Sequence, residues 1–148
     1  MKVAEWIKQH PRAAATIPPD APLEAIIDQM LETPGLRDIY VISVEGVLAG
    51  HISHRQLTRL LLVEHQPAHT RRELIERVVS GIASEIMERH FTFAKPDEEL
   101  DDVLHRQLDS NLEDMPVIDP SGTPLGVINL TRILEIIRGN SVHNLTPE

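Results

Sequence analysis

Cysteine is absent from the 148-residue sequence, which excludes disulfide bonds, thiolate metal ligands and a cysteine nucleophile. Aromatic residues are scarce, with one Trp, one Tyr and two Phe, so the core must be mainly aliphatic. No apolar run approaches the roughly 18 residues that a membrane span needs. The N-terminal segment MKVAEWIKQHPR has no long apolar run and no small-residue cleavage site. We therefore expect a cytoplasmic protein that does not associate with membranes.

Positive charge is in the minority, since 14 Lys and Arg residues stand against 23 Asp and Glu residues. The formal net charge of −9 argues against a nucleic-acid partner, because phosphate binding needs clustered positive charge. A chain of this length forms one domain of ordinary size or two small halves that share a core.

The sequence also lacks the motifs of common catalytic and metal sites. Its seven glycines form neither a Walker loop nor a dinucleotide-binding loop, and no serine lies in a nucleophile-elbow pattern. Of the eight histidines, His51 and His54 flank a strand-to-helix corner, His65 and His69 flank a proline, and no His-Glu-x-x-His motif occurs. We therefore predict no metal site, no catalytic residues and no enzymatic activity, and interpret the histidines as surface or capping residues.

What the sequence does contain is a duplicated strand-to-helix corner. The segment LAGHISHRQLTRLLL recurs later in the chain as LGVINLTRILEIIR. Gly126 follows Gly50 by 76 positions, and Ser53 and Asn129, three residues after each glycine, are good helix N-caps. We interpret the chain as two copies of one unit, with its function at the two corners.

Hydrophobic spacing, proline and glycine predict the same order in both copies: helix, strand, helix, strand, strand, helix. The expected elements of the first copy cover residues 3–8, 13–17, 20–33, 38–44, 47–52 and 53–64. Those of the second cover residues 83–88, 91–94, 97–108, 114–118, 123–128 and 129–138. Gly139 is expected to end the last helix. A capping box at residues 70–73 predicts a connecting helix through Val79.

The domain boundaries follow from this duplication. We expect a first repeat over residues 1–65, a helical connector over 66–82, a second repeat over 83–139 and a C-terminal tail over 140–148. A hairpin with one added strand is marginal alone, so the copies should pack about a pseudo-twofold axis, each sheet covered by its own helices, with two equivalent clefts between them. The expected apolar helix faces are Leu23, Ile26, Ile27, Met30 and Leu31 in the first copy and Leu100, Val103, Leu104 and Leu108 in the second.

These features resemble a tandem pair of cystathionine-β-synthase (CBS) domains, or Bateman module, from about Val3 to Arg138. The resemblance is carried by the helix starts PDAPLEAIIDQM and PDEELDDVLHRQL, the run DMPVIDPSGTPLGVINLTRIL and its weaker copy DIYVISVEGVLAGHISHRQL. It implies an α/β fold of duplicated β-α-β-β-α repeats and a regulatory role. It also implies clefts for adenosine ligands such as AMP, ADP or ATP, no required cofactor, and signalling through a homodimer or a separate protein partner.

The ligand signature of this family is Gly-x-x-Ser/Thr-x-x-Asp. The hydroxyl and the N–H groups of the helix start hold phosphate, and the carboxylate accepts hydrogen bonds from both ribose hydroxyls. The first copy has Gly50, Ser53 and Gln56, and the second has Gly126, Asn129 and Arg132. Gln56 has one acceptor oxygen and can bind the diol only in part, whereas Arg132 has none. Both corners therefore depart from the family pattern at the ribose-binding position.

Each corner has a second interpretation. Ser53 and Gln56 form a capping box, which stabilises a helix by about 1 kcal/mol without any ligand. Arg132 lies at the positive end of its helix, where it either binds an anion such as a nucleotide phosphate, together with Asn129, or pairs with a nearby carboxylate. The family's positions add four ligand candidates, of which the tyrosine is either a base-stacking or a core residue. These four are Thr16, Tyr40, Thr92 and Pro116.

Three functions remain open at this point. The first is a regulatory module that senses an adenosine nucleotide or another anion in the clefts. The second is a ligand-free dimerisation scaffold with degenerate nucleotide sites, which the substitutions at Gln56 and Arg132 favour. The third is a small metal-dependent or acid-base enzyme, for which the sequence has no motif.

Overall fold

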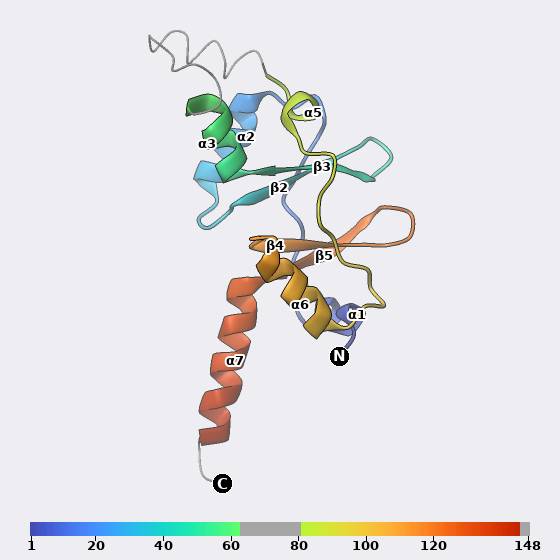
Figure 1. The fold of residues 1–148 in the computed structure, drawn as a ribbon, viewed down its shortest axis with the longest axis vertical. Coiled ribbons are helices and arrows are strands. Elements are labelled where there is room, and N and C mark those ends of the chain that lie inside the picture. The colour runs from blue at the N-terminus through green and yellow to red at the C-terminus, as the bar shows by residue number, and fades with distance from the viewer. Residues whose placement is uncertain (63–80, 146–148) are drawn as a thin grey trace.

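The computed structural model describes residues 1–62 and 81–145 of the chain (Figure 1). The first copy consists of α1 (Val3–Gln9), β1 (Thr16–Ile17), α2 (Leu23–Glu32), β2 (Asp38–Ile42), β3 (Leu48–Ser53) and α3 (His54–Leu62). The second copy consists of α5 (Ala83–Ile86), α6 (Leu100–Asp109), β4 (Asp114–Ile118), β5 (Pro124–Asn129) and α7 (Leu130–Leu145). The duplicated α/β architecture is confirmed. The helix expected over residues 70–79 lies outside the described residues.

Two small sheets form the centre of the molecule, one above the other in Figure 1. In the first, β1 pairs parallel to β2, and β2 pairs antiparallel to β3; in the second, β4 pairs antiparallel to β5. The two hairpins have the same register, because Asp38 pairs with Ser53 and Asp114 pairs with Asn129. The two helix-capping residues therefore lie opposite two equivalent aspartates.

The first strand of the second copy, expected over residues 91–94, is reduced to a single bridge at Ala94. In the first copy, the N–H of Tyr40 donates to the carbonyl of Ala15 at 2.8 Å and extends the pairing. Pro116 occupies the equivalent position in the second copy and has no N–H to donate. The second sheet is two-stranded because this proline interrupts the ladder.

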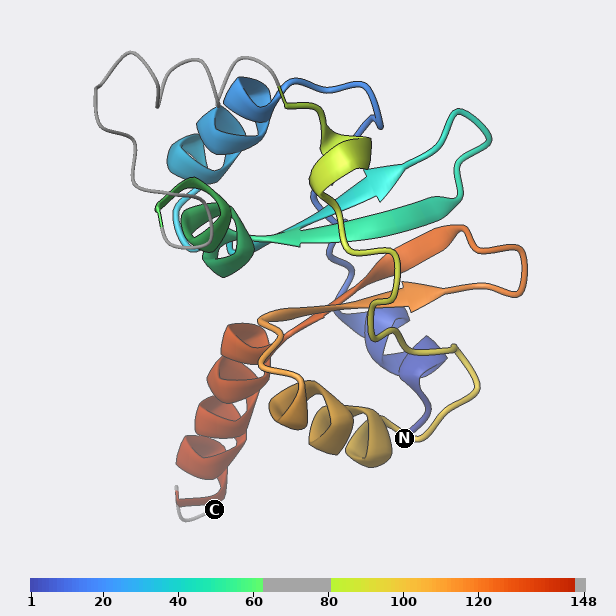
Figure 2. The same ribbon diagram turned by 45° about the horizontal axis from the view of Figure 1, so that its top comes forward.

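The first helix of each copy packs on the other copy, as Figures 1 and 2 show. α1 lies beside β5 and α6, and α5 lies beside β3. Backbone hydrogen bonds fix the exchange, since the N–H of Leu100 donates to Met1 and the N–H of Leu23 donates to Gly81, both at 2.9 Å. The expectation that each sheet is covered by its own helices is therefore wrong for these two helices.

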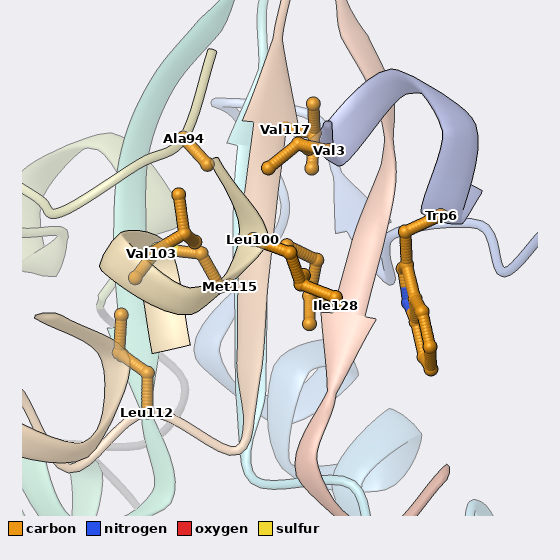
Figure 3. Close-up of a cluster of buried hydrophobic side chains, with 9 residues drawn as sticks. All are labelled: Val3, Trp6, Ala94, Leu100, Val103, Leu112, Met115, Val117 and Ile128. Atoms are coloured by element: carbon orange, nitrogen blue, oxygen red, sulfur yellow. The ribbon is translucent and has the colours of Figure 1, made fainter. Parts of the chain in front are cut away.

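Each copy has its own aliphatic core, to which the exchanged helix contributes. Val3 and Trp6 of α1 join the core of the second copy (Figure 3). Ala83 of α5 joins that of the first copy. The core drawn in Figure 3 contains Val3, Trp6, Ala94, Leu100, Val103, Leu112, Met115, Val117 and Ile128. The exchange means that neither copy buries its full core without the other.

Three details of the helices differ from expectation. On α6 the residue that faces inward is Gln107, with 0% of its surface exposed, whereas Leu108 is 61% exposed. The Gln107 amide turns inward because its Nε2 donates to the carbonyls of Leu112, Glu113 and Ile128 at 2.8–3.2 Å. α7 does not end at Gly139 but continues to Leu145. Leu31 of α2, expected on the buried face, is also exposed.

None of the helices within residues 1–62 and 81–145 is long and apolar enough to cross a membrane.

Candidate functional site

The first corner is built where β3 runs into α3. Ser53 caps the helix, because its Oγ accepts the N–H of Gln56 at 3.0 Å. The other half of the expected capping box is absent, since the Gln56 Nε2 donates to the carbonyl of Ile86 in α5. The Gln56 Oε1 is buried and has no hydrogen-bond partner. A cap is therefore formed, but the glutamine is turned toward the other copy.

A cavity of about 510 Å³ opens at this corner, between α3 of the first copy and the end of α6 in the second. Three arginines line it: Arg37, which precedes β2, and Arg55 and Arg59 of α3. Among the described residues, the guanidinium groups of Arg37 and Arg55 have no hydrogen-bond or ion-pair partner. Thr92 lies on the opposite wall, with its Oγ1 3.3 Å from the Oγ of Ser110. The first corner thus places two arginines inside a concave site without a partner among the described residues, although Asp38, Glu88 and Glu113 also line the cavity.

The floor of this cavity is a buried polar network that joins the two copies. His51 Nε2 lies 2.8 Å from Asp38 Oδ1, and both side chains are buried. The other carboxylate oxygen of Asp38 accepts the N–H groups of Glu113 and Asp114, at 3.2 and 3.3 Å. Asp38 thus connects the first corner to the start of β4.

Tyr40 completes this network from β2. Its ring stacks on His51 with centroids 4.9 Å apart, and its hydroxyl donates to the carbonyl of Asp114 at 2.8 Å. Burial, together with the charges of Asp38 and Asp114, raises the pKa of the Tyr40 hydroxyl, which therefore stays protonated and acts as a donor. With 1% of its surface exposed, Tyr40 is a core residue that links the copies.

The second corner, where β5 runs into α7, has the same backbone design and a different environment. Asn129 Oδ1 accepts the N–H of Arg132 at 2.9 Å, and Asn129 Nδ2 donates to Asp114 Oδ1 at 2.8 Å. The cavity here is about 250 Å³. Arg132 pairs with Glu135 at 3.2 Å, and Arg12 lies 3.8 Å from Asp114. Arg12 and Arg132 are therefore each paired with a carboxylate at this corner. The third arginine, Arg37, lines this cavity as well as the first.

Asp114 is the buried acid of the second corner. Burial raises the pKa of its carboxyl group, and the hydrogen bond from Asn129 and the nearby Arg12 oppose that shift only in part. The environment of this carboxylate favours its protonated form more than water does.

The structure distributes the eight predicted ligand residues over several places. Ser53, Gln56 and Thr92 line the first cavity, and Asn129 and Arg132 line the second. Thr16 lines a separate cavity of about 400 Å³ beside the turn after β1. Tyr40 and Pro116 are buried and line none of these cavities. The base-stacking interpretation of Tyr40 therefore gives way to its alternative as a core residue.

Several residues of the first cavity were not singled out from the sequence. They are Arg37, His54, Arg55, Arg59 and His90. Arg55 lies in the first turn of α3, at the positive end of the helix dipole. Arg132 also lies in the first turn of its own helix, and this placement made it a ligand candidate. Arg37 and His90 come from other segments of the chain, and only the folded arrangement brings them to this corner.

Comparison with known proteins identifies the family. Searching the curated proteins gave no match. Among solved structures, a CBS-domain-containing protein from Thermotoga maritima shares 29% sequence identity with a TM-score of 0.70, covering 90% of this chain and 92% of that one. The structure of CBSX2 in complex with AMP has 15% identity and a TM-score of 0.71, covering 95% and 98%.

A third similar structure is the cytosolic domain of the Mg²⁺ channel MgtE in complex with ATP, at 18% identity and a TM-score of 0.61, covering 83% of this chain and 44% of that one. The family profile of the CBS domain matches residues 9–63 and again residues 83–139. The duplicated corners, the equivalent hairpins and this double match together show that the chain belongs to the CBS-domain family, as a tandem pair.

Proposed function

We propose that this protein is a regulatory CBS pair that binds an adenosine nucleotide, or a similar anion, in the cavity of the first corner. The observation that carries this proposal is a pair of arginines, Arg37 and Arg55, that have no partner within residues 1–62 and 81–145 and line a cavity of about 510 Å³ between the copies. Two proteins of the same fold have been solved with AMP and with ATP, which supports a nucleotide as the first ligand to test.

The chemistry of the cavity suits a phosphate group at one end. Arg55 lies in the first turn of α3 and lines the cavity, so its side chain is available to a ligand there. Arginine presents several N–H donors in a planar fork that matches phosphate oxygens. The positive end of the α3 dipole adds to this attraction. Phosphate would be held by arginines here, more than by the serine hydroxyl, which already caps the helix.

Gln56 carries an unpartnered acceptor beside this cavity. Among the described residues nothing donates to its buried Oε1, and an unpartnered buried acceptor costs about 1–3 kcal/mol. Because this oxygen is buried, a ribose hydroxyl reaches it only if the Gln56 amide turns toward the cavity, and the new bond would then recover part of that cost. Because an amide offers one acceptor oxygen in place of the two of a carboxylate, we expect the ribose to be held less tightly than by the family signature.

A ligand bound in the first cavity would act on the second copy through the buried network beneath the cavity. Asp38 and Tyr40 reach from the first corner to the backbone of Glu113 and Asp114 in the second copy. A ligand that draws α3 toward the end of α6 would change how tightly the copies are held. The regulated element is then a dimer interface or a separate protein partner.

Calorimetric titration with AMP tests this proposal. We expect Arg55→Gln to weaken binding at least about tenfold, the loss of roughly 1.4 kcal/mol for one phosphate contact. Arg138→Gln removes an equally exposed arginine from α7, outside both cavities, and should bind as the wild type does. Equal affinities of all three proteins would overturn the assignment of the first cavity, and the absence of AMP binding would overturn the proposal itself.

A dimerisation scaffold is the second candidate, and one observation favours it. α6 and α7 of the second copy both carry large exposed apolar side chains, with Leu108 at 61%, Leu134 at 66% and Ile137 at 54%. Leu134 and Ile137 are three residues apart on α7 and so share a face, and exposed apolar faces of this kind mark interaction surfaces. Sedimentation of Leu134→Asp should show dissociation of a dimer, whereas Leu125→Asp, at an exposed position of β5, should leave the dimer intact.

A further inference from the structure

The segment that ends α6 forms one wall of the first cavity and contains a residue with an unusual backbone conformation. Among residues 1–62 and 81–145, Asn111 is the one residue other than glycine with a positive φ, at 55°. Glycine adopts this left-handed conformation freely, whereas it is unfavourable for other residues, of which asparagine tolerates it better than most. The equivalent position of the first copy, 76 residues earlier, is Gly35 with a φ of 78°. The fold therefore needs no side chain at this position, and the second copy nevertheless has one.

The Asn111 side chain is exposed and lines the first cavity. Its backbone is held in place, because the N–H of Asn111 donates to the carbonyl of Leu108 and the N–H of Leu112 donates to that of Gln107, both at 3.3 Å. Its side-chain amide makes no hydrogen bond to any group within residues 1–62 and 81–145. Gly35 lines the second cavity and has no side chain to offer there. One amide donor group and one amide acceptor are thus available to a ligand in the first cavity and have no equivalent in the second.

The two walls of this cavity suit different parts of a nucleotide. The wall of α3 carries Arg55 and is the positive end of that helix, so it attracts a phosphate group. The opposite wall is the negative end of α6 and disfavours phosphate. Its residues are uncharged up to Glu113, whose carboxylate accepts the Thr131 hydroxyl at 2.7 Å: Gln107, Leu108, Ser110, Asn111 and Leu112. A nucleotide held by its phosphate at α3 therefore turns its base toward the end of α6.

We propose that Asn111 is the residue that determines base specificity in the first cavity, and that its amide binds the amino-bearing edge of an adenine base. This inference rests on the proposed function and names the group that reads the base. The 6-amino group of adenine donates to Asn111 Oδ1, and the adjacent ring nitrogen accepts from Asn111 Nδ2, a pairing for which an asparagine amide carries both groups. Phe91 lines the same cavity and offers apolar surface to the face of the base.

Calorimetric titrations of wild type and Asn111→Gly with two nucleotides test this inference. The nucleotides are AMP and purine riboside 5′-monophosphate, which lacks only the 6-amino group. We expect wild type to bind AMP about tenfold more tightly than the second nucleotide, and Asn111→Gly to bind the two about equally. Glycine suits the backbone at this position, so the midpoint of urea denaturation should not fall in the variant. The ratio of the two affinities is taken within each protein, so a general change in the cavity does not affect it.

Gly35→Asn is the matched control, because it places the same side chain at the equivalent position of the second cavity, where no atom lies within 4 Å of an added Cβ. This variant should bind both nucleotides as wild type does. A ratio of affinities that is the same in wild type and Asn111→Gly, or equal binding of the two nucleotides by wild type, would overturn the inference while leaving AMP binding in place. Failure of wild type to bind AMP would overturn the proposed function and the inference with it.

Discussion

The two corners of this protein share a backbone and differ in the charges placed on it. Four pairs of equivalent positions, each 76 residues apart, differ in charge. They are Arg37 and Glu113, Arg55 and Thr131, Gln56 and Arg132, and Arg59 and Glu135. At the first corner, Arg37 and Arg55 have no ion-pair partner among the described residues, and the cavity is about 510 Å³. At the second, Glu135 neutralises Arg132 and the cavity is about 250 Å³. Duplication thus preserved the geometry, while substitution left one corner suited to an anion.

The buried networks beneath the corners are just as unequal. Asp38 accepts two N–H groups from the second copy and pairs with His51, whereas Asp114 accepts one side-chain hydrogen bond, from Asn129 of its own copy. Tyr40 reaches across to the other copy, and Pro116, its equivalent, has no group that could do so. The hydrogen bonds that Asp38 and Tyr40 make between the copies therefore run from the first corner into the second, whereas the second corner makes only the ion pair of Asp114 with Arg12 in return, among the described residues of these two networks.

The largest effect is expected from the two equivalent aspartates. Asp38→Ala leaves His51 and the N–H groups of Glu113 and Asp114 without a partner, and should lower the free energy of unfolding by about 3 kcal/mol. Asp114→Ala should lower it by only about 1 kcal/mol, because burial already disfavours that carboxylate. Urea denaturation measures both. Equal losses would contradict the unequal networks, and Asp38→Asn supplies the measurement if the alanine variant does not fold.

The second prediction concerns Gln107, which stands where Met30 stands in the first copy. Gln107→Met removes the amide that donates to the carbonyls of Leu112, Glu113 and Ile128, although it also removes the unpartnered Oε1. We expect a net loss of about 2 kcal/mol in urea denaturation. The neighbouring Leu108→Gln, at an exposed position, should change stability by less than about 0.5 kcal/mol. A neutral Gln107→Met would show that the second copy does not depend on this polar contact.

The third prediction uses the raised pKa of Asp114. Between the ordinary value of 3.8 and the raised one, the folded protein binds more protons at this group than the unfolded chain, so its contribution to stability falls as the pH rises. Asp114→Asn lacks this titration and can still accept the bond from Asn129. The unfolding free energy of the variant relative to wild type should therefore increase as the pH rises through this range. A difference that stays constant with pH would contradict the assignment.

Much of the fold was readable because local signals repeat at a fixed spacing. The capping residues, the two hairpins and the glycines of the corners recur 76 positions apart, and each is specified by its own neighbours. The sequence could not predict that α1 and α5 each pack on the other copy, because the apolar faces of these short helices fit either sheet. Backbone hydrogen bonds between the copies, among them those of Leu23 and Leu100, decide it in the folded protein.

For the site, the sequence predicted the helix caps but not which charged side chains have partners. Ser53 and Asn129 cap their helices as the sequence predicts. Of the two alternatives for Arg132, the pairing with a nearby carboxylate is the one observed, with Glu135 three residues further along the same helix. Arg37, by contrast, reaches the first cavity from a different segment, and no spacing in the sequence could show that it lacks a partner there.

The smallest expected effect tests whether the charge pairing alone keeps the second corner from binding an anion. In an Arg55→Gln background, Glu135→Gln releases Arg132 from an exposed ion pair that contributes about 0.5 kcal/mol. AMP should then shift the backbone amide signal of Arg132 in NMR titrations with an affinity about threefold higher than before. Glu5→Gln changes the net charge equally from α1 and should have no such effect. If both variants respond alike, net charge explains the gain. If neither responds, the smaller cavity and Glu113 keep the second corner from binding, so the difference between the corners lies in shape as well as charge.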